Sequence, residues 1–81
     1  SARDLALLDV YGRVRRLFDS LAVEREGARH IPEKLTHQEI ADRVGSSREM
    51  ISRLLKDLTE GGYISVAEKL ITLRKPLPPN W

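Results

Sequence analysis

Apolar residues recur every three or four positions over the first part of the chain, at the period of an amphipathic helix. The pattern predicts a helix over about residues 4–23, with charged residues on its other side. We expect a core helix with a solvated face, and its broad apolar face also allows contact with a domain outside the chain. The apolar positions are Leu7, Leu8, Val10, Tyr11, Val14, Leu17, Phe18 and Leu21.

The next segment, residues 24–32, is polar and contains Gly27 and Pro32. Glycine and proline in a polar run are typical of a loop. Residues 28–31 or residues 34–35 could each form a very short strand there. We therefore predict a loop, with these two strands as alternatives.

The pattern of residues 36–39 predicts the start of a helix. Thr36 and Glu39 have the spacing of a capping box, in which each side chain accepts a hydrogen bond from the other residue's backbone N–H. The helix that follows turns Ile40, Ala41 and Val44 inward, and Gly45 suits the left-handed residue that ends a helix.

A second capping signal follows directly, from Ser46 to Glu49. It opens a helix that ends at the Gly61–Gly62 pair and buries one apolar face. Two helices joined by a turn of about three residues form a helix-turn-helix, here over about residues 36–60. Small Ala41 suits the close crossing of the two helices. The apolar face of the second helix consists of Ile51, Leu54, Leu55 and Leu58.

The period changes after Gly62. Residues 63–66 and 69–73 are rich in β-branched and aromatic residues and predict an antiparallel hairpin, or wing, over about residues 63–74. Ala67–Glu68 separates the strands and lacks the glycine or asparagine of a tight turn. The hairpin prediction therefore depends on strand propensity. Residues 76–81 contain three prolines and predict an extended, mobile tail.

Composition limits the class of protein. The 81 residues suffice for one small domain, and the absence of cysteine excludes disulfides and thiolate metal sites. No apolar run is long enough for a membrane span or a signal peptide. The chain begins with Ser1 and its only methionine is Met50, so we expect it to be part of a longer protein.

Net charge is only +2, from 14 basic and 12 acidic residues. Such a balance does not by itself indicate nucleic-acid binding. However, residues 1–33 carry six basic and six acidic side chains, whereas residues 34–81 carry eight and six. The whole surplus therefore lies in the half that contains the helix-turn-helix and the wing.

The outward side of the second helix of the motif carries the candidate chemistry. Arg48 and Arg53 suit bidentate contacts with guanine in the major groove, and Glu49 can accept from cytosine. Ser47, Ser52 and Lys56 suit contacts with phosphate. Two structural interpretations of Glu49 stay open: a surface ion pair with Arg53, or the acid of a capping box with Ser46.

Two segments together resemble a known family. Residues 35–41 (LTHQEIA) and residues 44–56 (VGSSREMISRLLK) are similar to the C-terminal winged-helix domain of the Crp/Fnr family, in the branch of the cyclic-AMP receptor protein. The resemblance covers about residues 5–73. It implies a mainly α domain with a small antiparallel β wing, a winged helix-turn-helix, over residues 1–75.

The resemblance also implies roles for individual residues. Arg48, Glu49 and Arg53 match the three base-reading positions of the family, whose half-site resembles TGTGA. Contacts with the DNA backbone fall on Thr36, Gln38 and Ser47, and on Lys69 in the wing. Two positions depart from the family pattern: Met50 replaces a small polar residue, and the wing tip carries Glu68 without a glycine.

Partners follow from the resemblance as well. We expect double-stranded DNA with a palindromic operator, a homodimer in the full-length protein, and a contact with RNA polymerase near residues 24–32, although this loop is shorter here. No cofactor or metal is expected in this domain, and an effector such as a cyclic nucleotide would bind an N-terminal domain absent from this chain. The expected location is the cytoplasm, with no membrane partner.

Two other classes of function, a protein-contact module and an enzyme, can be compared with DNA binding on the same residues. A winged helix can serve protein contact without DNA binding, and this is the alternative interpretation. An enzyme is not expected, because no nucleophile–base pair or metal set can be assembled. His37 has no partner at catalytic spacing and is interpreted as a solvent-facing or phosphate-facing residue.

Overall fold

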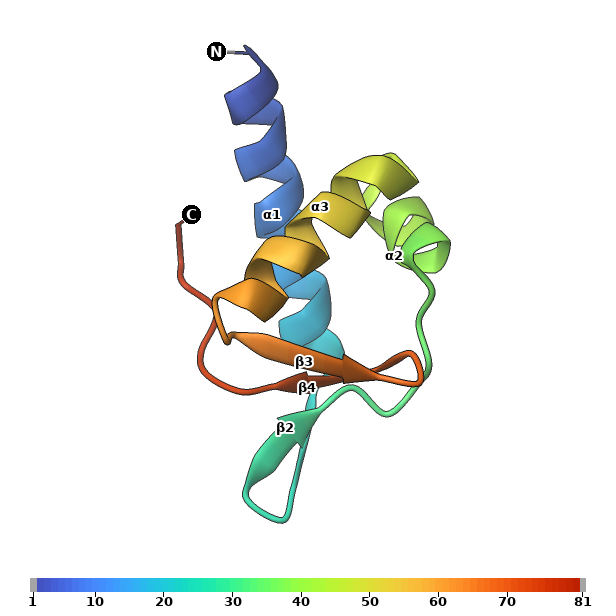
Figure 1. Ribbon diagram of the computed structural model, residues 1–81, viewed down its shortest axis with the longest axis vertical. Helices are drawn as coiled ribbons and strands as arrows, with labels where there is room; N and C mark the ends of the chain where they lie inside the picture. Colours follow the sequence, from blue (N-terminus) through green and yellow to red (C-terminus); the bar gives the residue numbers. More distant parts are fainter. Residues whose placement is uncertain (1, 81) are drawn as a thin grey trace.

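Three helices cover one side of a four-stranded antiparallel sheet (Figure 1). The computed structural model describes the backbone of residues 2–80 and the side chains of residues 6–80. In chain order the elements are α1 (Ala2–Leu21), β1 (Val23–Arg25), β2 (Ala28–His30), α2 (His37–Val44), α3 (Arg48–Glu60), β3 (Ile64–Ala67) and β4 (Leu70–Leu73). The predicted winged helix-turn-helix is thereby confirmed.

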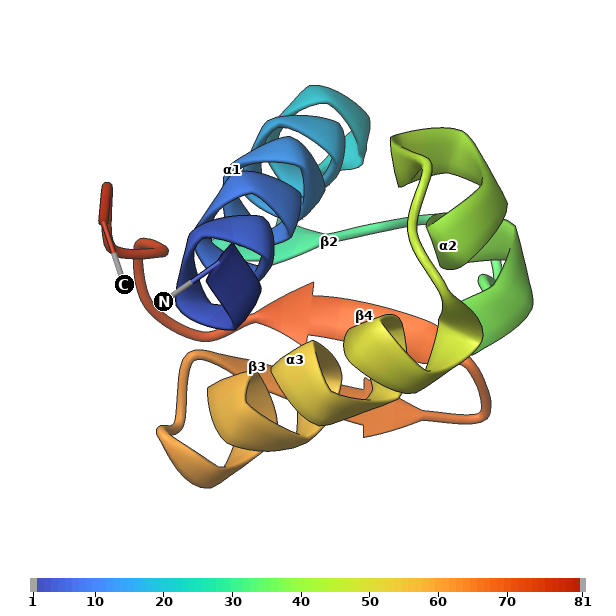
Figure 2. The ribbon, with the colours of Figure 1, turned by 90° about the horizontal axis from the view of Figure 1, so that it is seen from above.

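Helix α1 forms as its apolar period predicts, slightly nearer the N-terminus than residues 4–23. Val10, Tyr11, Val14 and Phe18 are buried in the core, together with the apolar faces of α2 and α3. Leu8 is 43% exposed, so the inward stripe is narrower than the sequence alone indicated. Seen from above, α1 runs beside α2 and α3, over the strands (Figure 2).

Residues 24–32 are not simply a loop as predicted, and the alternative of a short strand over residues 28–31 is confirmed by β2. Strands β1 and β2 pair there as a hairpin whose turn is Glu26–Gly27, with φ of 54° and 78°. Strand β2 also pairs with β4, so the sheet order is β1-β2-β4-β3 and the wing is part of a larger sheet. Residues 34–35 form no strand, although the Leu35 N–H donates to the Lys69 carbonyl at 3.1 Å.

The caps of the helix-turn-helix decide how α3 is presented. The Thr36–Glu39 capping box is present, and Gly45 adopts the left-handed conformation with φ of 73°. The second cap is Ser47, not Ser46, because the Ser47 hydroxyl accepts from the Met50 N–H at 3.2 Å. Met50 therefore occupies the third helical position, and the capping-box interpretation of Glu49 is wrong.

The turn of the wing lies one residue later than expected. Ala67 pairs with Leu70, so the turn is Glu68–Lys69 rather than Ala67–Glu68. Both turn residues have positive φ, 52° and 65°, which is the pattern of a type I′ turn. The period of two along each strand explains the shift, because this register turns Ile64, Ile71 and Leu73 into the core.

Replacing Glu68 with asparagine is expected to stabilise the domain. Asparagine adopts positive φ more readily than glutamate, and the gain should be about 0.5–1 kcal/mol. For a domain of this size the melting temperature should rise by about 2–8 °C in a thermal unfolding scan. Glu24→Asn in β1 makes the same charge change at a residue without positive φ, and no gain is expected. Equal effects of the two changes would contradict the argument.

The C-terminal segment packs on the domain. Leu77 is 5% exposed and belongs to the core, and the Tyr11 hydroxyl donates to the Pro78 carbonyl. Burial raises the pKa of the Tyr11 phenol. The sequence predicted a mobile tail from residue 76, and that pattern gave no sign that Leu77 is a core residue. Trp81, the last residue of that predicted tail, lies outside the described residues.

Candidate nucleic-acid interface

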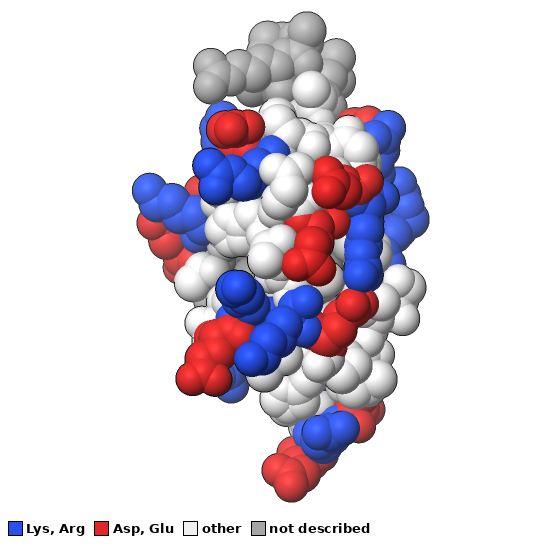
Figure 3. Space-filling view, turned by 90° about the vertical axis from the view of Figure 1, so that its right-hand side faces the viewer, with Lys and Arg blue, Asp and Glu red and all other residues white. Residues whose placement is uncertain are grey.

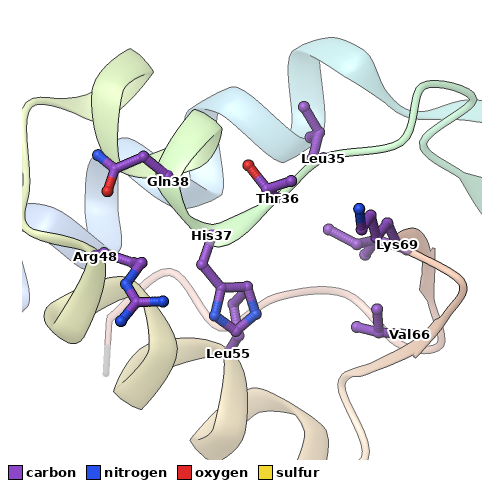
Figure 4. A pocket seen from close by; sticks show the side chains of 9 residues that line it. Leu35, Thr36, His37, Gln38, Arg48, Leu55, Val66 and Lys69 are labelled. Carbon is purple, nitrogen blue, oxygen red and sulfur yellow. The ribbon is translucent and has the colours of Figure 1, made fainter.

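A hollow of about 470 Å³ lies between the start of α2, the side of α3 and the wing (Figure 4). It brings together side chains that are far apart in the sequence and that are each predicted to contact DNA. Arg48 enters from α3, Thr36 and Gln38 from the start of α2, and Lys69 from the wing turn. The apolar residues that line it are Leu35, Leu55, Val66 and Ile71.

A second hollow of about 380 Å³ continues along α3. It shares His37, Leu55 and Val66 with the first, so the two hollows adjoin. Ser52 and Lys56, both predicted phosphate contacts, line this second hollow. Six of the nine predicted contact residues therefore lie along one surface, which we call the groove.

The remaining three, Ser47, Glu49 and Arg53, lie on α3 or its cap outside the two hollows. Because successive residues are about 100° apart around a helix, Glu49 and Arg53 share the outward side of α3 with Lys56. All three are exposed, opposite the buried Ile51 and Leu58. Two of the three predicted base-reading residues, Glu49 and Arg53, therefore lie on the outward side of α3 beside the predicted phosphate contact Lys56.

The side chains of Arg48, Glu49 and Arg53 form no hydrogen bond or ion pair within residues 6–80. Glu49 and Arg53 therefore do not form the surface ion pair that was one interpretation of the sequence. Charged groups without protein partners keep their full hydrogen-bonding capacity for a ligand. For two arginines on an outward helix face, that ligand chemistry is the guanine edge or phosphate.

Two predicted phosphate contacts are engaged inside α2. The Thr36 hydroxyl donates to Glu39 at 3.0 Å, and the Gln38 amide donates to Asp42 at 2.8 Å. Both residues are at the start of α2, where backbone N–H groups and the helix dipole favour an anion. Gln38 keeps a second amide N–H for phosphate, whereas the single hydroxyl hydrogen of Thr36 goes to Glu39 and must leave it before Thr36 can donate to phosphate.

His37, interpreted from the sequence as solvent-facing or phosphate-facing, was not among the predicted contact residues. Its Nδ1 lies 2.7 Å from the Ser52 hydroxyl, and its ring lines both hollows of the groove. The contact between His37 and Ser52 could not be predicted from the sequence, because the two residues are 15 positions apart and lie on different helices. Placing the first residue of α2 against the second turn of α3 requires the crossing of the two helices, which a linear pattern does not give.

Charges of both signs are interspersed on the surface that includes the side of α2. Figure 3 shows Lys and Arg alternating with Asp and Glu there rather than forming a continuous basic field. Arg43 forms two bonds to the Glu33 carboxylate, at 2.9 and 3.0 Å. Hydrogen bonding from Arg43 lowers the pKa of Glu33, and the same bond raises the pKa of Arg43. Arg43 thus connects α2 to the segment that precedes it.

Arg13 connects α1 to the turn that precedes α3. Its Nη1 donates to the Val44 carbonyl, the last of α2, at 3.1 Å, and its Nη2 lies 2.9 Å from Asp9. A cation at a helix C-terminus satisfies an end carbonyl and complements the helix dipole. Arg13 thus holds the end of α2 in place, next to Gly45 and the turn.

Arg13→Met should destabilise the domain by about 0.5–1.5 kcal/mol, because one charge-assisted hydrogen bond and the dipole contact are lost. Urea denaturation measures this change. Arg16→Met is the matched control on the same helix, since Arg16 makes no hydrogen bond or ion pair within residues 6–80. The capping role is refuted if the two variants unfold at the same urea concentration.

Within residues 6–80, no three or more histidine or acidic side chains lie together as a metal site. No helix in the described part of the chain is both long and apolar enough to cross a membrane.

Comparison with known proteins adds an independent observation. Residues 12–76 match the family of Crp-like helix-turn-helix domains. The cAMP-activated global transcriptional regulator Vfr of Pseudomonas aeruginosa is 42% identical over 73 residues, which cover 86% of this chain and 34% of Vfr. The cAMP-activated global transcriptional regulator CRP of Salmonella typhimurium is 38% identical over 73 residues, 86% of this chain and 35% of CRP.

Among solved structures, the reduced (Fe(II)) CO-sensing protein from R. rubrum superposes with a TM-score of 0.77 at 29% identity, over 91% of this chain and 35% of that protein. The chain thus spans about a third of the length of these relatives.

Proposed function

This chain belongs to the family of Crp-like helix-turn-helix domains, and we propose that it is the sequence-specific DNA-binding domain of a Crp/Fnr-type transcription regulator. The observation that carries the proposal is the presentation of Arg48, Glu49 and Arg53. They lie exposed on α3, without side-chain partners in residues 6–80, beside a groove lined by further phosphate-binding groups.

In the proposed complex α3 lies in the major groove and reads a half-site that resembles TGTGA. The guanidinium groups of Arg48 and Arg53 donate two hydrogen bonds each to guanine O6 and N7. The Glu49 carboxylate accepts from cytosine N4, and its place in the first turn of α3 suits a base contact. These three residues supply sequence choice.

Phosphate contacts seat the domain on the duplex and carry no sequence information. In the proposal they come from both sides of the groove, and the wing turn adds a cation. Because Ser47 uses its oxygen to cap α3, its hydroxyl hydrogen is the group that donates to phosphate. The proposed backbone contacts are Thr36, Gln38, Ser47, Ser52, Lys56 and Lys69.

A single copy should bind weakly, because charges of both signs are interspersed on the surface that includes the side of α2 and the net charge is only +2. We propose that the full-length protein is a cytoplasmic homodimer on a palindromic operator, which gains affinity by joining two half-sites. An effector such as a cyclic nucleotide would bind outside this chain. RNA polymerase is the proposed protein partner of the β1–β2 hairpin.

Fluorescence anisotropy with two duplexes tests the proposal, one with the TGTGA-type half-site and one with the same bases scrambled. Binding should weaken with salt, with a slope of log affinity against log salt of about −0.9 for each phosphate neutralised. The TGTGA-type duplex should bind more tightly. Absence of salt-dependent binding to either duplex would instead support a winged helix that serves protein contact.

A further inference from the structure

Of the two histidines in the chain, His37 is the one in the groove. It is the first residue of α2, its ring is exposed, and both hollows share it. Figure 4 shows the ring in the hollow that Arg48 enters from α3. A phosphate bound between α2 and α3 would therefore meet this ring.

The contact with Ser52 determines how the ring can act. At 2.7 Å, Nδ1 and the Ser52 hydroxyl form a hydrogen bond that fixes the ring plane. A neutral imidazole carries one N–H, whereas the protonated ring donates from both nitrogens. When protonated, His37 donates from Nδ1 to Ser52 and keeps a charged Nε2–H for a second acceptor. Ser52 thus acts as a positioning residue for this ring.

The charged side chains around the ring belong to α3 and the wing. Arg48 of α3 and Lys69 of the wing line one hollow, and Lys56 and Glu60 of α3 line the other. A phosphate bound in the groove brings negative charge next to the ring, and an adjacent negative charge favours the imidazolium over the neutral imidazole.

We propose that His37 takes up a proton as DNA binds and that the imidazolium contacts a backbone phosphate. This inference rests on the proposed DNA binding. Affinity then rises as pH falls through the range in which histidine changes charge, about pH 8 to about pH 5.5. One linked proton limits the rise to about tenfold per pH unit, since a tenfold change in proton concentration shifts a one-proton equilibrium by that factor. It also adds about 0.9 to the magnitude of the salt slope.

Anisotropy titrations of the 81-residue chain at several salt concentrations, at about pH 8 and about pH 5.5, test this. The salt slope of the wild-type chain should be steeper at the lower pH by about 0.9. His37→Gln should show the shallow slope at both pH values, and His37→Arg the steep slope at both. His30→Gln is the matched control, because His30 pairs with Thr72 at 3.2 Å and lines neither hollow of the groove.

The outcomes separate this inference from the proposed function. Binding that is salt-dependent but has the same slope at both pH values overturns the role of His37 and leaves DNA binding intact. A pH effect that survives in His37→Gln and disappears in His30→Gln overturns it too. No binding by the wild-type chain at either pH would overturn the proposed function itself.

Discussion

Arg53→Ala is expected to reduce the preference for the TGTGA-type duplex over its scrambled partner to what Arg48 and Glu49 supply. The change removes a bidentate contact with guanine, which is worth about 1–3 kcal/mol of discrimination, or about 5- to 160-fold. Because Arg53 makes no hydrogen bond or ion pair within residues 6–80, its removal leaves no protein group unpaired. Competition titrations with the two duplexes measure the ratio of affinities directly.

Lys56→Ala is the matched control, one turn along the same outward side of α3. As a proposed phosphate contact it should weaken binding to both duplexes alike and reduce the salt slope by about 1. The base-reading role of Arg53 would be wrong if Arg53→Ala behaved in the same way as Lys56→Ala.

Phe18→Ala should cost about 3–5 kcal/mol of the free energy of unfolding. Phe18 is fully buried on α1, and alanine leaves a cavity in the core that the helices and the sheet share. Small domains have only about 5–15 kcal/mol of stability, so about a fifth or more would be lost. Urea denaturation followed by circular dichroism gives the value, and DNA binding should decline with the folded fraction.

Leu8→Ala on the same helix is the comparison, because Leu8 is 43% exposed and its side chain leaves little space behind. We expect a cost of about 0.5 kcal/mol or less, as for other surface changes. A similar cost for both substitutions would contradict the placement of the core.

The helices could be predicted because their signals are local. The period of apolar residues located α1, α2 and α3, and the Thr36–Glu39 box and Gly45 marked two helix ends. Strand β1 was missed because it has three residues, two of them charged, and because its hairpin is held to the sheet by β2 pairing with β4 more than 40 positions away. Charged three-residue strands have no hydrophobic period to detect.

In the candidate site, too, some features follow from local sequence signals and others depend on the packing of the chain. Exposure of Arg48, Glu49 and Arg53 follows from the helical period of α3 alone. The cap shifted from Ser46 to Ser47 because both serines have the right chemistry and only the backbone of the turn decides between them. The His37–Ser52 bond depends on how two helices cross, which is a property of packing.

The burial of Leu77 bears on where the domain can be cut. The family match ends at residue 76 and the sequence pattern suggested an end at residue 75, so either boundary would discard Leu77. A fragment trimmed there would expose the apolar surface that this side chain covers and would lose the bond between Tyr11 and Pro78. Such exposed surface promotes association between molecules. Trimming at either position would thus yield a less soluble protein, although every residue proposed to meet DNA would still be present.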